Sequence, residues 1–231
     1  MRIGIICAIP NELRYFNFSE NPIQKIGERK FYKGSHDKHE LILVQSGLGK
    51  VNAAVVSTLL IEKFKCEFLL FSGVAGGIDP EVEIGEVIIA ESLIQYDYGT
   101  LKNGEMVPFR PGSIPKGKPK NDLEYSLDPI IKRKLKASLP NVLMGKFITG
   151  DVFLQCKNTN KELFKKYGAQ AIDMEGAAVA QVAEQFGIPA VVVRCLSDLA
   201  GADSEKLSSK FLNKAAKRSS NTAQKILNIL L

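Results

Sequence analysis

The chain has 231 residues, of which 45% are hydrophobic and 24% are charged. This composition is typical of a globular protein and excludes a disordered, collagen-like or low-complexity chain. The formal net charge is +6, and most of the basic excess lies between residues 110 and 136. A nucleic-acid site would need basic residues spread over a surface and a recognisable motif, so we interpret this stretch as a solvated loop and helix face and expect no nucleic-acid partner.

The apolar runs, histidines and cysteines indicate where the protein is located and whether it binds a metal. No stretch approaches 18 uncharged apolar residues, so no membrane span is expected, and Pro10 and Glu12 follow the apolar start without a signal-peptide cleavage site. Two histidines, His36 and His39, share one polar turn and predict no metal site. We expect no cofactor. The cysteines are far apart, which favours reduced buried thiols in a cytoplasmic protein; they are Cys7, Cys66, Cys156 and Cys195.

Apolar runs in the first half of the chain predict buried strands that alternate with a helix. The predicted strands are residues 3–9, 31–32, 41–45 and 68–71, and the predicted helix is residues 51–61. The turn at residues 46–50 contains Gly47 and Gly49, but it matches only half of a dinucleotide-binding motif. After the strand at 68–71, the glycines of residues 73–77 predict a loop that a ligand could approach closely.

The second half of the chain continues this alternation. Strands are predicted at residues 85–93, 142–149, 169–173 and 188–196, and helices at 127–139, 161–167, 178–186 and from Ser204 onward. Residues 97–121 are rich in proline and glycine and predict a long surface loop. No internal repeat is present. We therefore predict one α/β domain over residues 1–231, with three layers in which helices flank a central, twisted, mixed sheet.

Candidate functional residues follow the predicted strands, because ligands of open α/β sheets bind beyond the carboxyl ends of the strands. Several of them are carboxylates, and no Ser–His or Cys–His pair accompanies them. Such a set suits general acid and base catalysis on a neutral, hydroxyl-rich substrate better than acyl transfer. Taken singly, Glu12, Glu175 and Asp198 could each be a helix cap or a surface ion-pair partner.

Six segments taken together resemble the bacterial 5'-methylthioadenosine/S-adenosylhomocysteine nucleosidases of the purine nucleoside phosphorylase superfamily. They are residues 3–8 with Glu12, 46–54, 72–77, 149–153, 173–177 and 193–198. Their order and spacing match over almost the whole chain, except for residues 97–121. The resemblance implies a nucleoside phosphorylase-like fold, and hydrolysis of the N-glycosidic bond of an adenine nucleoside to release adenine and a 5-thioribose product.

The resemblance also implies three catalytic residues, Asp198, Glu12 and Arg194, and a ribose-binding residue, Glu175. Asp198, oriented by Ser197, would protonate or strongly hydrogen-bond purine N7, which requires a carboxyl with a raised pKa. Glu12 would take a proton from the attacking water, and Arg194 would help to hold that water or the glutamate. Glu175 would bind the 2'- and 3'-hydroxyls of the ribose and stabilise its positive charge in the transition state.

Further positions are implied to bind the nucleoside. Met174 would lie against the ribose, Phe153 would stack on adenine, the backbone of Leu154 would read the purine edge, and Leu48 would line the 5'-pocket. The remaining implied binding residues are Ala75, Gly76 and Asp173. Two positions depart from the family pattern: Asp173 stands where glutamate is more frequent, and Val74 where many members have serine. A homodimer is implied, in which Phe109 or Pro111 of a neighbouring subunit would complete the 5'-site.

Other activities remain open at this point. A phosphorylase would need a basic, glycine-rich phosphate site near the first strand, whereas Glu12 stands there and would repel phosphate. Hydrolysis of futalosine or aminodeoxyfutalosine in menaquinone synthesis would use the same residues on a different 5'-group. A non-catalytic purine-nucleoside binding protein is a third alternative, which the joint presence of Glu12, Glu175 and Asp198 disfavours.

Overall fold

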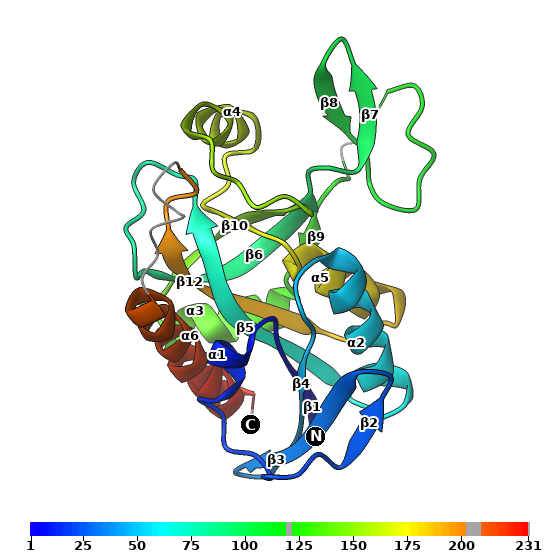
Figure 1. Ribbon diagram of the computed structural model, residues 1–231, viewed down its shortest axis with the longest axis vertical. Coiled ribbons are helices and arrows are strands. Elements are labelled where there is room, and N and C mark those ends of the chain that lie inside the picture. The colour runs from blue at the N-terminus through cyan, green and yellow to red at the C-terminus, as the bar shows by residue number, and fades with distance from the viewer. Residues whose placement is uncertain (119–121, 202–208, 231) are drawn as a thin grey trace.

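A ten-stranded mixed β-sheet forms the centre of the computed structural model, which describes residues 1–118, 122–201 and 209–230 (Figure 1). Its strands are β1 (Arg2–Cys7), β2 (Gln24–Ile26), β3 (Arg29–His36), β4 (His39–Gln45), β5 (Phe68–Gly77), β6 (Val87–Gln95), β9 (Tyr125–Ser126), β10 (Leu143–Thr149), β11 (Ala171–Asp173) and β12 (Ala190–Asp198). The helices are α1 (Pro10–Leu13), α2 (Lys50–Glu62), α3 (Pro129–Ser138), α4 (Lys157–Tyr167), α5 (Gly176–Gln185) and α6 (Ser209–Ile229).

The sheet partly closes on itself. The strands follow the order β11-β10-β6-β12-β5-β1-β4-β3-β2, and β11 also pairs with β5. Because β5 is the fifth strand in that order, the pairing joins β5, β12, β6, β10 and β11 into a ring. Gly76 of β5 pairs with Ile172 of β11 on one side and with Asp198 of β12 on the other. The carboxyl ends of three strands therefore meet at one place in the fold.

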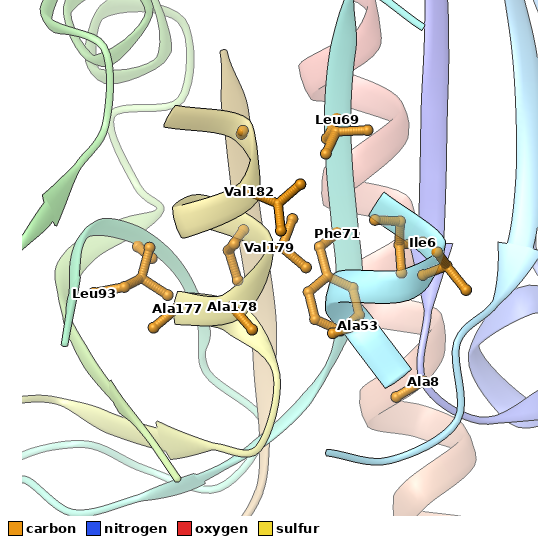
Figure 2. Close-up of a cluster of buried hydrophobic side chains, with 14 of the residues drawn as sticks. Ile6, Ala8, Ala53, Leu69, Phe71, Leu93, Ala177, Ala178, Val179 and Val182 are labelled. Atoms are coloured by element: carbon orange, nitrogen blue, oxygen red, sulfur yellow. The ribbon is translucent and has the colours of Figure 1, made fainter. Parts of the chain in front are cut away.

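Helices cover both faces of the sheet, and a separate hydrophobic cluster fills each interface. One cluster joins the sheet to α2 and α5 through side chains such as Ala53, Phe71 and Val179 (Figure 2). The other joins the sheet to α1, α3 and α6 through residues such as Leu135 and Ile226. These layers confirm the predicted three-layer α/β fold with a central mixed sheet; the assignment of residues 1–231 to one domain stays a prediction.

Two predicted loops contain regular strands. The glycines of residues 73–77 belong to β5, because this segment pairs with β12 and β11 instead of forming a free loop. The predicted surface loop at 97–121 contains a hairpin of β7 (Gly99–Lys102) and β8 (Glu105–Pro108), which projects from the body of the molecule (Figure 1). Asn103 and Gly104 form its turn with φ of 52° and 83°, the conformation that an Asn-Gly pair favours between two strands.

Other predicted bounds also change. Ser197 and Asp198 are the last residues of β12 instead of following it, and the predicted helix start at Ser204 lies outside the described residues. The cysteines are all free thiols, but the prediction that all are buried is wrong for Cys156, which is exposed before the first turn of α4. No helix in the described part of the chain is long and apolar enough to cross a membrane. The cytoplasmic location stays a prediction.

Candidate active site

A cavity of about 400 Å³ opens at the carboxyl ends of β5, β11 and β12. Its volume falls within the range of small-molecule sites, and apolar side chains form most of its wall. The wall consists of Ile9, Leu48, Val74, Ala75, Gly76, Val152, Phe153, Leu154, Ile172, Asp173, Met174, Glu175, Ser197, Asp198, Ala200 and Leu212. Every predicted substrate-binding residue is in this set, together with Asp198. Glu12 and Arg194 are not.

Asp198 is a buried carboxyl group at the end of β12. Ser197 Oγ lies 2.9 Å from Oδ2 and donates to it, and the backbone N–H of Ala200 donates to Oδ1 at 2.8 Å. Burial raises the pKa of Asp198, whereas these two hydrogen bonds oppose the rise. A carboxyl group with a raised pKa remains protonated to a higher pH and can therefore donate its proton to a bound molecule.

Glu175 lies before the first turn of α5, and its carboxylate faces the N-terminus of α2. Oε1 accepts a hydrogen bond from Gly49 N at 2.9 Å, and Oε2 accepts one from Arg194 Nη2 at 3.2 Å. Burial raises the pKa of Glu175 to about 7, although the positive charge of Arg194 lowers it. Near neutral pH this carboxyl group therefore changes charge easily when a ligand arrives.

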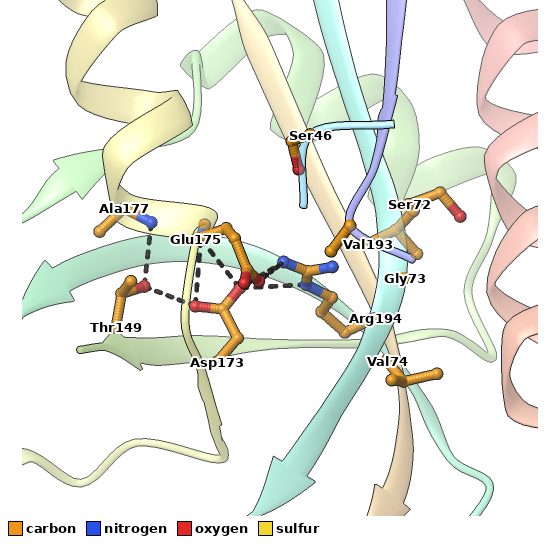
Figure 3. Close-up of polar contacts among 12 residues, drawn as sticks. Ser46, Ser72, Gly73, Val74, Thr149, Asp173, Glu175, Ala177, Val193 and Arg194 are labelled. Carbon is orange, nitrogen blue, oxygen red and sulfur yellow. Dashed lines mark hydrogen bonds and ion pairs between the residues drawn. The ribbon is translucent and has the colours of Figure 1, made fainter. Parts of the chain in front are cut away.

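Arg194 is fully buried and fixed mainly by Asp173 (Figure 3). Its Nε and Nη2 donate to Asp173 Oδ2 at 3.0 and 2.7 Å, and its guanidinium carbon lies 3.8 Å from the centre of the Phe71 ring. Asp173 also accepts from Thr149 Oγ1 and from the backbone N–H of Gly176. The Asp173 carboxylate is thus engaged by the protein itself, although the residue is part of the cavity wall.

The third nitrogen of the same guanidinium group, Nη1, differs from Nε and Nη2. Arg194 Nη1 is buried and has no hydrogen-bond partner among the residues that the structure describes. A Cβ added at Gly73 would lie 2.2 Å from this nitrogen and 2.6 Å from Glu12 Oε1. Arg194 and Glu12 therefore both pack over Gly73, next to Val74 of the cavity wall. An unpaired buried donor is costly, so it marks a place where a ligand or water can bind.

Glu12 is held by backbone N–H groups on the other side of this space. Oε2 accepts from Ala8 N at 2.7 Å and from Ile9 N at 3.1 Å, and Oε1 accepts from Val74 N at 3.0 Å. Burial raises the pKa of Glu12, and the nearby Arg194 charge lowers it. Since Ile9 and Val74 are both part of the cavity wall, Glu12 lies immediately behind it, and a raised pKa makes its carboxylate a better base.

Sequence reasoning missed several residues of the wall. Ile9, Val152, Ile172 and Leu212 are apolar and carry no chemical signal in the sequence. Ala200 could have been found only from its position two residues after Asp198. Within residues 1–118, 122–201 and 209–230, no group of three or more His, Cys, Asp or Glu side chains could hold a metal ion.

The fold and the site define a protein of the phosphorylase superfamily, whose family model matches residues 2–231. A 5'-methylthioadenosine/S-adenosylhomocysteine nucleosidase of Mycobacterium tuberculosis is 37% identical over 248 residues, which cover 99% of this chain and 97% of the relative. The chain belongs to the 5'-methylthioadenosine/S-adenosylhomocysteine nucleosidases within that superfamily, which confirms the resemblance seen in the sequence.

Solved structures agree with this assignment. The nucleosidase of Streptococcus pneumoniae, solved with a transition-state inhibitor, has a TM-score of 0.87 and 28% sequence identity, and all of both chains is covered. The futalosine hydrolase of Helicobacter pylori has a TM-score of 0.83 and 28% identity, with 99% of this chain and 96% of that chain covered. Because of this second similarity, hydrolysis of futalosine or aminodeoxyfutalosine stays an alternative activity.

Proposed function

We propose that this chain hydrolyses the N-glycosidic bond of 5'-methylthioadenosine and S-adenosylhomocysteine and releases adenine and the corresponding 5-thioribose product. One observation carries the proposal: Asp198 and Glu175, each with a raised pKa, face one mainly apolar cavity, and Glu12 lies immediately behind its wall. The names of the relatives support the substrate, and the inhibitor bound by the Streptococcus pneumoniae nucleosidase supports a catalytic site.

Asp198 is proposed as the acid that makes adenine a leaving group. Adenine leaves poorly as an anion, so a proton on N7 lowers the energy of the transition state as the bond from N9 to the sugar C1' breaks. Burial raises the pKa of Asp198, so this carboxyl keeps its proton to a higher pH than an exposed aspartate does. Ser197 Oγ and the Ala200 N–H each contact one carboxyl oxygen and fix the direction of the group.

Glu12 is proposed as the base that activates water. The water would lie between its carboxylate and the unpartnered Arg194 Nη1, above Gly73, where both groups converge. Glu12 accepts one water proton while the oxygen bonds to C1', so the Asp198 proton leaves with adenine and the water proton stays on Glu12. With Val74 in place of serine, the side chain at this position cannot hydrogen-bond to the water.

Glu175 is proposed to bind the two ribose hydroxyls. Ionised, it accepts two hydrogen bonds and also stabilises the positive charge that develops on the sugar. Its hydrogen bonds from Gly49 N and Arg194 Nη2 favour this ionised form. Arg194 in turn depends on Asp173, so Asp173 contributes by fixing Arg194.

The remaining wall residues are proposed to contact the rest of the nucleoside. Phe153 is 56% exposed, and stacking on adenine would cover it. Leu154 would present its backbone to the purine edge and Met174 would pack on the ribose. Ala75 and Gly76 belong to the cavity wall, and Gly76 pairs with Asp198. Leu48, 57% exposed, would contact the 5'-substituent.

The activity is tested by incubating the protein with 5'-methylthioadenosine, S-adenosylhomocysteine, 5'-deoxyadenosine and aminodeoxyfutalosine, each with and without phosphate, and by quantifying the free adenine. We expect release from the first two substrates without phosphate and almost complete loss of release in Asp198→Asn. Asp122→Asn, at an exposed aspartate outside the cavity wall, serves as the control. Turnover that requires phosphate would contradict hydrolysis.

Futalosine-type hydrolysis is the second candidate function. The similarity to the Helicobacter pylori futalosine hydrolase supports it, and the same acid, base and ribose contacts would serve. The 5'-group alone distinguishes the two substrates, so preferential release of adenine from aminodeoxyfutalosine in the same assay would favour this alternative.

We also propose that the chain acts as a homodimer. Val51 and Val55 lie one helical turn apart on α2 and are 75% and 48% exposed, next to Leu48. Contact with a second copy would bury these side chains. Phe109 is buried in its own chain, so Pro111, which is only partly buried, is the better candidate to reach a neighbouring subunit. Sedimentation of the wild type and of Val51→Asp tests the dimer, which the variant should dissociate.

A further inference from the structure

One of the two groups that orient the Asp198 carboxyl is a peptide unit in the turn after β12; the other is Ser197 Oγ. The N–H of Ala200 donates to Asp198 Oδ1 at 2.8 Å. A backbone N–H can only donate, so Oδ1 is an acceptor whether or not the carboxyl group is protonated. Ser197 Oγ, beside Oδ2, can donate to Ala75 O at 3.3 Å instead. Oδ2 is therefore the oxygen that can carry the acidic proton, and the peptide between Leu199 and Ala200 helps to determine where that proton points.

This turn has little freedom to adopt another shape. Ala200 has a φ of +46°, in the left-handed region where residues with a Cβ are uncommon. The turn also packs closely on β5, since a Cβ added at Gly76 would lie 3.0 Å from Ala200 Cβ and 3.2 Å from Asp198 Oδ1. A small rotation of the turn would move the Ala200 N–H away from the carboxyl group.

The other end of the same peptide is held by a side chain of α4. Asn160 Nδ2 donates to Leu199 O at 2.8 Å, and it also lies 3.3 Å from Gly77 O at the end of β5. Since a peptide unit is planar and rigid, a bond to its carbonyl oxygen fixes the direction of its N–H. Asn160 itself is outside the cavity wall formed by the described residues.

We propose that Asn160 is a positioning residue for the acid Asp198: by binding the Leu199 carbonyl it keeps the Ala200 N–H on Oδ1 and leaves Oδ2 to donate its proton to the substrate. The inference rests on the proposed function, because it assigns a role to a residue that acts through Asp198. No pattern in the sequence indicates this role, since Asn160 is 38 positions before Asp198 and α4 follows the segment that contains Phe153 and Leu154.

The test compares Asn160→Ala with the wild type. We expect kcat to fall about 10- to 100-fold, the cost of a misplaced catalytic group, while KM changes less than about threefold. The Ala200 N–H stabilises the ionised form of Asp198 and lowers its pKa. Loosening that bond raises the pKa, so the alkaline limb of the kcat profile should move to higher pH, a change that a purely structural role would not cause.

Two further variants show whether a change in kcat comes from the loss of the Asn160 hydrogen bond. Asn158→Ala removes an exposed amide from the same helix turn and should match the wild type in kcat and pH profile. Asn160→Gln retains the amide donor and should recover part of kcat. If Asn160→Ala is too unstable to assay, Asn160→Gln replaces it, and its alkaline limb should move to higher pH by a smaller amount. A folded Asn160 variant with wild-type kcat and pH profile would overturn the inference, whereas a wild type unable to release adenine would overturn the proposed function itself.

Discussion

Replacement of Gly73 by alanine tests whether Glu12 and Arg194 work together. The added Cβ would lie 2.2 Å from Arg194 Nη1 and 2.6 Å from Glu12 Oε1, whereas unstrained contacts between heavy atoms are about 3.5 Å or longer. One group must therefore move by about 1 Å or more. Neither can do so freely, because Asp173 holds Arg194 and three backbone N–H groups hold Glu12.

A displacement of about 1 Å at catalytic groups costs about 100-fold in rate, which corresponds to about 2.7 kcal/mol of transition-state stabilisation. We expect Gly73→Ala to lower kcat by at least this factor in a steady-state assay of adenine release. The variant should also lose about 1–3 kcal/mol of stability through overpacking, so stability needs a matched control.

Gly4→Ala provides that control. Its Cβ would lie 2.8 Å from Leu60 Cδ1 and 2.9 Å from Leu69 Cδ2, a milder crowding in the core that leaves Glu12 and Arg194 in place. Both variants should melt below the wild type, but Gly4→Ala should keep its kcat. If Gly73→Ala kept kcat within about threefold of the wild type, the proposed water site between Glu12 and Arg194 would be wrong.

Three further predictions follow from the geometry of the site. Phe153→Ala should raise KM about tenfold with little change in kcat, because stacking of an aromatic side chain on a base contributes about 1–3 kcal/mol; an unchanged KM would remove Phe153 from the adenine site. Asp173→Asn leaves the buried Arg194 charge without its main partner, so it should cost about 3–5 kcal/mol in urea unfolding, whereas Asp122→Asn, in an exposed pair, should cost about 1 kcal/mol or less. Because the folded pKa of Glu175, about 7, is above its ordinary value of 4.5, the folded state binds more protons between these values, and the free energy of unfolding should fall as pH rises from 4.5 to 7. Glu12 and Asp198 shift in the same direction, so Glu175→Gln should reduce this fall; an unchanged pH dependence would contradict the raised pKa.

The sequence predicted the layers of the fold because the apolar runs are long and their alternation is regular. It failed for the glycines of residues 73–77, since glycine often marks a turn, whereas here Gly73 leaves space for two charged side chains inside a strand. The hairpin at residues 99–108 was predictable, because Asn103-Gly104 lies between two short extended segments. The proline and glycine content of its surroundings concealed that signal.

For the site, the sequence identified the wall of the cavity but not the contacts behind it. Asp173, Arg194 and Thr149 come from three strands, and their hydrogen bonds depend on how the ring of strands closes. Asn160, on α4, likewise bonds to the turn after Asp198, 38 positions further along the chain. Such pairs share no spacing in the chain, so only the tertiary structure reveals them.

In the proposed reaction, adenine departs after it receives a proton from Asp198 at N7. The most direct measurement compares the cleavage of 5'-methylthioadenosine with that of its 7-deaza analogue, in which a carbon replaces N7, in the wild type and in Asp198→Asn. We expect that the wild type cleaves only 5'-methylthioadenosine, and that the variant cleaves neither while still binding the analogue. Cleavage of the 7-deaza analogue at the rate of 5'-methylthioadenosine would contradict it.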